Sequence, residues 1–517
     1  MEDESTRGNE LEGVQKLVQT ENETTSDEAK RLKGRELDDA LYAALLSRAH
    51  SDQAHALVDA VAKLAIEQEV AAGIRTNKRD KKQTALASAV ERLLADLLQA
   101  QASETNKGYV FRPLRPEGFT GQAVSYRTFK SLVDAMLSLG LLESYKGFQM
   151  WTSFGGPQAP MRQKATRYRA TRGLLDIFEQ HGVHAADFHQ HFLIPLPENP
   201  LVLRAASRRN EYGTKISGKP MRFERTAVTM NLEQEIKQLN KYLDGFVLRG
   251  GIHRGYIRVF NNGNHSKFDW NMGGRLYSYG EFNYQQLERA ERLKMTINDE
   301  AVCEIDIRAS YLTIFHALYD EPFDPTNDPY DVPGLGPEAR DVVKMWVTAS
   351  FGNNAPITKW PKEHVAKYRE KTGKTLGKHY PASKVGERIM QSFPLLRRIG
   401  EVVDGRERGW SELMYIESQA MVGATIALMH RRIPSLAVHD SLIVPVSNWR
   451  QAMIDLAHWY IRFVNAWPVL VPHFPEGHEM PSFKQNRTTI ESGYYTLSND
   501  PDVPAYSADD PMNPLNL

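Results

Sequence analysis

Apolar residues at three- and four-residue spacing dominate the amino-terminal part of the chain. This pattern occurs in LDDALYAALLSRA, HALVDAVAKLAIEQEVAAGI and ALASAVERLLADLLQA, which are rich in Ala and Leu and contain no proline. Such spacing places the apolar side chains on one side of an α-helix. We therefore expect two or three amphipathic helices between residues 36 and 101.

A further amphipathic helix is predicted to begin after Ser125, a residue type that caps helix N-termini. Its apolar face would consist of Phe129, Leu132, Val133, Met136 and Leu139. The helix is followed by LLESYKGF, a polar loop, the alternating segment KATRYRATR and the helical pattern GLLDIFEQHG. Helix, strand, basic loop, strand and helix follow one another in this order in a winged helix-turn-helix.

This segment resembles the winged-helix domains of plasmid-type replication initiators and related transcription factors. The resemblance rests on SYRTFKSLVDAMLSLGLLE and RQKATRYRATRGLLDIF and covers about residues 80–185. It implies a DNA-binding domain over residues 80–195, after a helical region over residues 36–79. Contacts to phosphates would come from Arg127, Lys130, Arg162, Lys164, Arg167 and Arg169. A helical domain with a solvated basic hairpin is the alternative interpretation.

The composition is that of a globular protein without a charge bias. Of the 517 residues, 41% are hydrophobic, and 64 Lys and Arg residues balance 64 Asp and Glu residues. Binding of nucleic acid must therefore come from a local basic surface. One cysteine, Cys303, excludes an intramolecular disulfide framework and a multi-cysteine zinc site.

The chain carries no pattern of a membrane or secreted protein. No apolar run is long enough to span a bilayer, and the start MEDESTRGNE lacks the apolar segment of a secretory signal. We expect a cytoplasmic protein with no membrane partner, encoded by a prokaryote, phage or plasmid. Residues 1–35 and 486–517 are polar and are predicted to be loosely ordered tails.

Two segments in the carboxy-terminal half combine β-like patterns with aspartates. LKMTINDEAVCEIDIRASYLTIFHAL contains two short β-like runs around Asn298 and Asp299; the second ends in Asp306, and a helix follows from about Ser310. RRIPSLAVHDSLIVPV predicts a hairpin with the His439-Asp440 dipeptide at its tip. Burying an aspartate among strands is costly unless it meets a cation. Two such aspartates can hold two Mg²⁺ ions about 3.5 to 4 Å apart, which is the chemistry of nucleotidyl transfer.

The helix predicted for GPEARDVVKMWVTASFGNN lies between these segments. Arg340, Lys344 and Phe351 fall on one face of it. Cations suit a triphosphate, and an aromatic ring suits a base or sugar. An ordinary amphipathic helix with its cations in water is the alternative.

Taken together, these motifs resemble in type, order and spacing those of the DNA polymerase I family and the single-subunit phage RNA polymerases. The resemblance covers about residues 245–450 and extends to GGRLYSYGEF before the first motif and IESQAMVGATIALMHRR before the last. It implies an α+β fold, with a right-hand polymerase palm and fingers over residues 196–485. It also implies a primer-template, nucleoside triphosphates and two Mg²⁺ ions, which Mn²⁺ can replace.

The resemblance assigns roles to individual residues. Asp306, Asp440 and Lys344 would be catalytic, and Asp306, Asp440 and the Ile307 carbonyl would bind metal. The nucleotide would be bound by Arg340, Lys344, Phe351, Tyr311 and Arg275, and the primer or template by His439 and Gly352.

Three departures leave the substrate open. The family usually has a tyrosine eight positions after the lysine, whereas Phe351 stands seven positions after Lys344. Ser441 after the His-Asp dipeptide is typical of RNA polymerases, whereas Tyr311 and Phe351 favour deoxyribonucleotides. We expect a DNA polymerase; the alternatives are a primase or single-subunit RNA polymerase, and a non-catalytic replication initiator or repressor.

Overall fold

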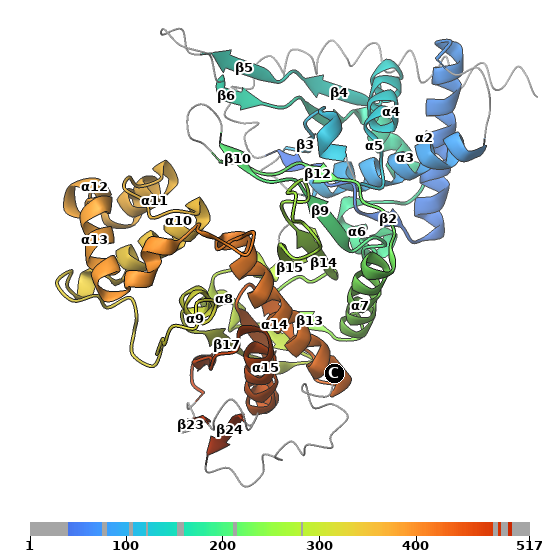
Figure 1. The fold of residues 1–517 in the computed structure, drawn as a ribbon. Coiled ribbons are helices and arrows are strands. Elements are labelled where there is room, and N and C mark those ends of the chain that lie inside the picture. Colours follow the sequence, from blue (N-terminus) through green and yellow to red (C-terminus); the bar gives the residue numbers. More distant parts are fainter. Residues whose placement is uncertain are drawn as a thin grey trace, which may run out of the picture. The chain divides into compact units, whose positions relative to one another are not determined.

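The computed structural model describes residues 40–74, 80–102, 107–119, 122–151, 160–209, 215–280, 283–478, 484–487 and 495–498. The chain divides into two compact units, Met1–Pro195 (unit 1) and Leu196–Leu517 (unit 2). Both combine helices with mainly antiparallel sheets, in agreement with the predicted α+β class (Figure 1). Residues 1–35 and most of residues 486–517, predicted as tails, lie outside the described residues.

Unit 1 is a helical layer on a four-stranded sheet with the strand order β1-β3-β7-β4. Its helices are α2 (Asp52–Ala71), α3 (Asp80–Gln101), α4 (Tyr126–Ser138), α5 (Arg172–Gln180) and α6 (Phe188–His191). Its strands are β1 (Leu41–Tyr42), β2 (Arg48–Ala49), β3 (Tyr109–Phe111), β4 (Leu142–Tyr145), β5 (Phe148–Trp151), β6 (Pro160–Lys164), β7 (Arg167–Ala170) and β8 (Phe192–Leu193). Apolar residues of α2 to α5 share one core, so residues 36–79 do not pack apart from the segment predicted as a winged helix.

The helices of unit 1 match the apolar pattern except at the start. α2 and α3 confirm two of the predicted helices, and α4 begins after Ser125, whose hydroxyl accepts a hydrogen bond from the Thr128 amide at 3.1 Å. The helix predicted for LDDALYAALLSRA is wrong. Leu41–Tyr42 pairs with β3, and Arg48–Ala49 pairs with β8. Ala and Leu favour a helix, but this preference is small in energy per residue, and sheet pairing in the folded chain outweighs it.

Unit 2 contains a six-stranded sheet and a four-stranded sheet. The six-stranded sheet has the order β13-β16-β17-β21-β20, with β22 also paired to β17, and the four-stranded sheet has the order β12-β9-β14-β15. The strands are β9 (Leu201–Arg204), β10 (Arg208–Arg209), β11 (Lys215–Ile216), β12 (Pro220–Met221), β13 (Leu248–Arg249), β14 (Tyr256–Phe260), β15 (Gly273–Ser278), β16 (Thr296–Ile297), β17 (Glu300–Ile307), β18 (Val402–Val403), β19 (Arg406–Glu407), β20 (Leu436–Val438), β21 (Ser441–Pro445), β22 (Leu470–His473), β23 (Lys484–Arg487) and β24 (Tyr495–Ser498).

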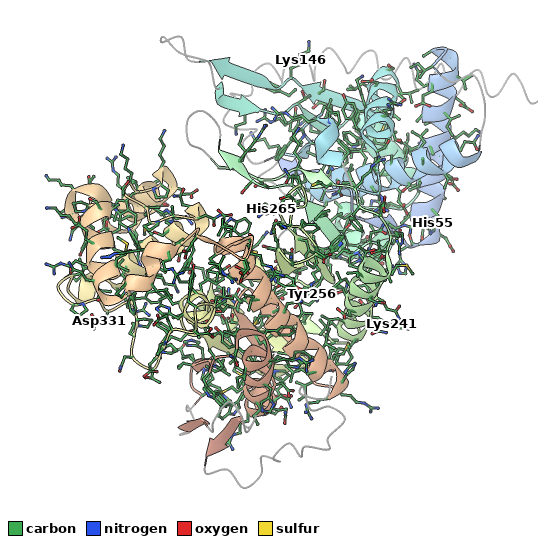
Figure 2. All side chains as sticks on the ribbon, viewed as in Figure 1. His55, Lys146, Lys241, Tyr256, His265 and Asp331 are labelled. Carbon is green, nitrogen blue, oxygen red and sulfur yellow. The ribbon has the colours of Figure 1, made fainter. Side chains whose placement is uncertain are left out.

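The helices of unit 2 form two groups. α10 to α13 lie together on one side of the unit, and α14 packs against α15 and β15 (Figure 1). The helices are α7 (Ala227–Leu243), α8 (Arg289–Arg292), α9 (Ser310–Ala317), α10 (Arg340–Asn353), α11 (Lys362–Thr372), α12 (Leu376–His379), α13 (Ala382–Ser392), α14 (Trp410–His430) and α15 (Trp449–Val464). In Figure 2, Tyr256 lies inside the unit, whereas Lys241 lies on the outer helix α7.

The centre of unit 2 confirms the predicted local elements. Asn298 and Asp299 both adopt a positive φ and turn the chain between β16 and β17, and α9 begins at Ser310. His439 and Asp440 form the two-residue tip between β20 and β21, and His439 has a φ of 55°. Within the described residues, no helix is both long and apolar enough to cross a membrane.

Candidate active site

The two predicted aspartates meet at adjacent strand ends in unit 2. Asp306 lies opposite Ser441 in the β17–β21 ladder, and the Ile307 amide donates a hydrogen bond to the Asp440 carbonyl at 3.1 Å. This bond joins the hairpin tip to the end of β17. The pairing of sequence-distant strands therefore brings Asp306 and Asp440 to one place.

An open cavity of about 700 Å³ lies at this point. Every residue predicted for the polymerase-like site borders it: Arg275, Asp306, Ile307, Tyr311, Arg340, Lys344, Phe351, Gly352, His439 and Asp440. The charged residues of its lining are the cations Arg275, Arg289, Arg308, Arg340 and Lys344 and the carboxylates Asp306, Glu417 and Asp440. We call it the central cavity. Its excess of cations suits a polyanionic ligand.

The ionised form of Asp306 is destabilised by its surroundings. Burial and the neighbouring Asp440 carboxylate raise the pKa of Asp306 to about 6, while Arg289 and Lys344 oppose the rise. Two carboxylates held this close repel each other in the absence of a cation. The site therefore gains stability from any positive charge placed between the two aspartates.

The helix α10 supplies two cations from its first two turns. Arg340 forms an ion pair with Asp328, and Lys344 is exposed. The Tyr330 ring lies 5.6 Å from the Arg340 guanidinium carbon and 5.9 Å from the Lys344 ammonium nitrogen. Tyr330 also borders the central cavity, so cation–π contacts hold both cations beside it.

Tyr311 stands on the wall of the central cavity in a fixed position. The Arg275 Nη2 group donates to the Tyr311 hydroxyl at 3.2 Å, and Arg275 Nε donates to Glu417 Oε1 at 3.1 Å. Phe351 is fully buried, with its ring centre 6.0 Å from that of Tyr311. Phe351 thus borders the central cavity and packs edge-on against Tyr311, and its predicted contact with the nucleotide stays a prediction.

Arg275 borders the central cavity and also has two partners within the protein. Its guanidinium contacts the buried Glu417 carboxylate, which is 1% exposed, and the Tyr311 hydroxyl. The ion pair holds the pKa of Arg275 above its usual range against the effect of burial. Arg275 thus reaches the central cavity mainly through the side chains that it positions. Glu417 was missed because nothing in its helical pattern distinguishes it from a surface glutamate.

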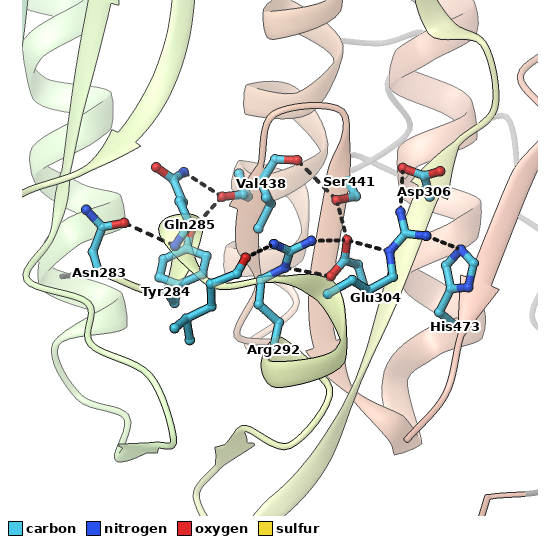
Figure 3. A network of polar contacts seen from close by, with 12 residues as sticks. Asn283, Tyr284, Gln285, Arg292, Glu304, Asp306, Val438, Ser441 and His473 are labelled. Atoms are coloured by element: carbon cyan, nitrogen blue, oxygen red, sulfur yellow. Dashed lines mark hydrogen bonds and ion pairs between the residues drawn. The ribbon is translucent and has the colours of Figure 1, made fainter. Parts of the chain in front are cut away.

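A second network, also missed, lies directly beside Asp306 (Figure 3). Glu304 is 1% exposed and accepts hydrogen bonds from Arg292 Nε and Nη2, both at 2.8 Å, and from the Ser441 hydroxyl at 3.0 Å. Burial alone would raise the pKa of Glu304, but Arg292 and Arg289 outweigh it and lower the pKa. Glu304 stands two residues before Asp306 on the same strand face, and this two-residue period was the available signal.

The hairpin that bears Asp440 is held by two buried phenols. The Tyr284 hydroxyl donates to the Ala437 carbonyl at 2.6 Å, and the Ala437 amide donates to the Tyr256 hydroxyl at 2.8 Å. The two hydroxyl oxygens are 2.7 Å apart. Because β20 is the last strand of its sheet, these phenols bind main-chain groups that a further strand would otherwise pair with.

The residues around Asp306 suit a divalent metal ion whose coordination is completed by substrate. Among the residues that the structure describes, no group of three or more His, Cys, Asp and Glu side chains could hold a metal. Two carboxylates and a main-chain carbonyl are nevertheless oxygen donors of the kind that Mg²⁺ takes together with substrate phosphates. Burial and the Asp440 carboxylate raise the pKa of Asp306, so a cation bound by both carboxylates would relieve their repulsion.

Among the described side chains, the cations predicted for the winged helix differ in exposure. Arg127 and Lys130 are exposed on α4, and Lys130 forms an ion pair with Asp134 at 2.6 Å. Arg167 is 3% exposed and donates to the Ala165 carbonyl, so the phosphate contact predicted for it is wrong. A buried guanidinium cannot reach a duplex.

The β-strand cations also include residues with internal partners. Arg169 forms an ion pair with Glu143 at 2.5 Å and lies 4.8 Å from the Tyr109 ring centre, and its predicted phosphate contact stays a prediction. Lys164 is half-buried at the end of β6, and the side chain of Arg162 lies outside the described residues. Four strands, β4 to β7, lie between α4 and α5, whereas one strand on each side of a basic loop was predicted; β6 (Pro160–Lys164) occupies the end of the segment predicted as that loop.

Comparisons with known proteins find no matching family and only distant structural likenesses. No protein-family model and no curated protein matches the sequence. Among solved structures, a similar chain is the POL domain of Pol1 from M. smegmatis in complex with DNA primer-template and dNTP. It is 15% identical, with a TM-score of 0.28, and the match covers 76% of this chain and 69% of that chain. This likeness is too distant to assign a function, which must be argued from the residues of the central cavity.

Proposed function

We propose that the chain is a template-dependent nucleotidyltransferase that extends the 3′ end of a nucleic acid, and that its product is DNA. The observation that carries the proposal is the convergence of Asp306, Asp440, Arg340 and Lys344 on the central cavity. Carboxylates for metal ions and cations for a triphosphate are the parts that nucleotidyl transfer requires.

Each group has a proposed task. Divalent ions held by Asp306, Asp440 and the Ile307 carbonyl would activate the 3′-hydroxyl and neutralise the leaving pyrophosphate. Arg340 and Lys344 would bind the triphosphate and hold it in line with the attacking oxygen. Lys344 would lie beside the phosphates, which suits the catalytic role predicted for it.

The shape of the cavity wall supports a deoxyribose substrate. The Tyr311 hydroxyl accepts a hydrogen bond from Arg275, and the Phe351 ring packs against the Tyr311 ring, so both contacts oppose its displacement by an incoming sugar. A rigid aromatic wall favours the sugar that lacks a 2′-hydroxyl. His439 lies next to Asp440 at the hairpin tip, with its ring centre 6.3 Å from that of Tyr277. From this position it would contact the primer end.

A DNA-targeting role is proposed for unit 1. The exposed Arg127 and Lys130 on α4 and the β5–β6 hairpin support contact with duplex phosphates, since α4 precedes the hairpin as a recognition helix precedes a wing. Arg167 and Arg169 are left out of this surface. Such binding would weaken steeply with salt.

The test is extension of a labelled primer on a DNA template with Mg²⁺. Deoxyribonucleotides and ribonucleotides are supplied separately, an unprimed template is run in parallel, and an Asp306→Asn/Asp440→Asn double variant serves as the control. We expect primer extension with deoxyribonucleotides that the double variant lacks. Ribonucleotide products on unprimed template would replace this proposal by a primase. Absence of any product from folded, DNA-binding protein would favour a non-catalytic initiator or repressor.

A further inference from the structure

Arg289 supplies a positive charge to one of the two aspartates of the central cavity. Its Nη2 group lies 3.4 Å from Asp306 Oδ1, its Nε group 3.3 Å from Glu304 Oε1, and its Nη1 group 3.1 Å from His473 Nε2. Among the ion pairs of the described residues, this is the one that reaches Asp306. Figure 3 shows Glu304, Asp306 and His473 gathered on neighbouring strands around this contact.

The Glu304 carboxylate has partners besides Arg289. Arg292 binds both of its oxygens at 2.8 Å, and the Ser441 hydroxyl adds a bond at 3.0 Å. If Arg289 moves, the buried Glu304 carboxylate therefore still has hydrogen-bond partners. Its side chain is 40% exposed, whereas that of Arg292 is 10% exposed, so Arg289 has room to move and Arg292 does not.

The contact between Arg289 and Asp306 competes with any other cation at the same carboxylate. A guanidinium this near a divalent ion repels it, and the ion pair must loosen for Asp306 to turn its charge to the ion. When the contact with Asp306 loosens, Arg289 would keep its contacts with Glu304 and His473. The need to break the Arg289–Asp306 contact therefore weakens the binding of a metal ion to Asp306.

We propose that Arg289 is a displaceable counter-ion of Asp306, which fixes the divalent-ion concentration at which the central cavity becomes loaded. This inference rests on the proposed function, because it assumes that Asp306 binds a metal ion. Arg289 is a positioning residue in this account. It acts on the reaction only through Asp306.

The test measures Mn²⁺ binding to the full-length chain without nucleotide or DNA, from the electron paramagnetic resonance signal of free Mn²⁺. For Arg289→Gln we expect the dissociation constant for Mn²⁺ to fall about five- to tenfold, the effect of removing one partly screened charge near the site. Arg289→Lys keeps the charge and should bind Mn²⁺ nearly as the wild type does. The Mg²⁺ concentration for half-maximal primer extension should fall in parallel in Arg289→Gln.

Arg308→Gln is the matched control. Arg308 borders the same cavity but donates to the Thr326 carbonyl at 2.8 Å, so its loss should change the Mn²⁺ dissociation constant about twofold or less. Asp306→Asn identifies the site, because it should remove the binding that is measured. Thermal unfolding of each variant verifies that the fold is kept.

The outcomes separate the two claims. If wild-type chain binds Mn²⁺ through Asp306 and Arg289→Gln binds it no more tightly, the counter-ion proposal is wrong while the proposed function stands. If Arg308→Gln has the same effect as Arg289→Gln, the cause is the general charge of the cavity, and the specific pairing is also rejected. If the wild type binds no Mn²⁺ without substrate, the counter-ion proposal is wrong, whereas the proposed function is decided separately by primer extension.

Discussion

The predicted polar residues converge in unit 2 and differ in exposure in unit 1. In unit 2, every residue predicted for the polymerase-like site borders the central cavity. In unit 1, Arg127 and Lys130 lie exposed on α4, whereas Arg167 is buried and Arg169 is paired with Glu143. A set of different residue types in a fixed order specifies a site, whereas repeated cations on alternate strand positions can equally serve the interior of a sheet.

The cations of α10 give the strongest test of this difference. In an Arg340→Gln/Lys344→Gln variant, kcat/KM for the nucleotide should fall about 10²-fold or more, since each charged contact to a phosphate contributes about 1.5 to 3 kcal/mol. Steady-state primer extension measures the effect. Lys371→Gln on α11 is the control, because Lys371 pairs with Asp341 outside the central cavity. An equal loss in the control would show that general charge, not this pair, matters.

The hydrogen bond from Tyr284 to the hairpin that bears Asp440 gives a second test of unit 2. Tyr284→Phe removes the hydroxyl that binds the Ala437 carbonyl at 2.6 Å, so we expect kcat to fall about tenfold, with little change in KM, as the Asp440 strand loosens. Single-turnover extension at saturating nucleotide measures this. Tyr242→Phe is a matched control, because the buried Tyr242 hydroxyl has no hydrogen-bond partner. A Tyr284→Phe variant with the wild-type rate would contradict a positioning role.

The pH dependence of stability tests the destabilisation of ionised Asp306 in unit 2. The folded state raises the pKa of Asp306 from 3.8 to about 6, so its ionisation costs stability as the pH rises through 6. Asp306→Asn should therefore raise the free energy of unfolding by about 2 kcal/mol at pH 8 and leave it nearly unchanged at pH 4.

Urea unfolding at the two pH values measures this difference. Asp341→Asn is the control, because Lys371 lowers the pKa of Asp341, and its replacement should bring no gain at pH 8. Equal stability of wild type and Asp306→Asn at pH 8 would mean that the ionised form of Asp306 is not destabilised by its surroundings.

The smallest expected effect concerns unit 1. An Arg127→Gln/Lys130→Gln variant should bind duplex DNA a few-fold more weakly at low salt, with a shallower salt dependence, since two phosphate contacts would be lost. Fluorescence anisotropy with the full chain measures both quantities. Arg169→Gln should leave the salt slope unchanged, because Arg169 faces Glu143. If Arg169→Gln lost more duplex affinity than Arg127→Gln/Lys130→Gln, the proposed distinction between exposed and internally paired cations would be wrong.

Much of the local structure could be predicted from the sequence. The turn at Asn298 and Asp299, the start of α9 at Ser310, the hairpin tip at His439 and the cap at Ser125 all follow from short-range signals. Each depends on residues adjacent in sequence, where turn chemistry and apolar spacing act directly.

The contacts that were not predicted involve partners distant in sequence. The pairing of Leu41–Tyr42 with β3 replaced a predicted helix, and Glu143 occupies Arg169. Likewise, the ion pairs of Arg275 with Glu417 and of Arg289 with Asp306 join different elements. Their existence depends on how strands and helices pack, which a local pattern does not encode.

The most direct measurement is Mg²⁺-dependent incorporation of a labelled deoxyribonucleotide onto a primer, with the wild-type chain and the Asp306→Asn/Asp440→Asn variant side by side. The account predicts templated extension by the wild type and at least about a 10³-fold lower rate for the folded double variant, which lacks both metal-binding carboxylates. Equal extension by the two proteins would contradict the assignment of the central cavity as the active site.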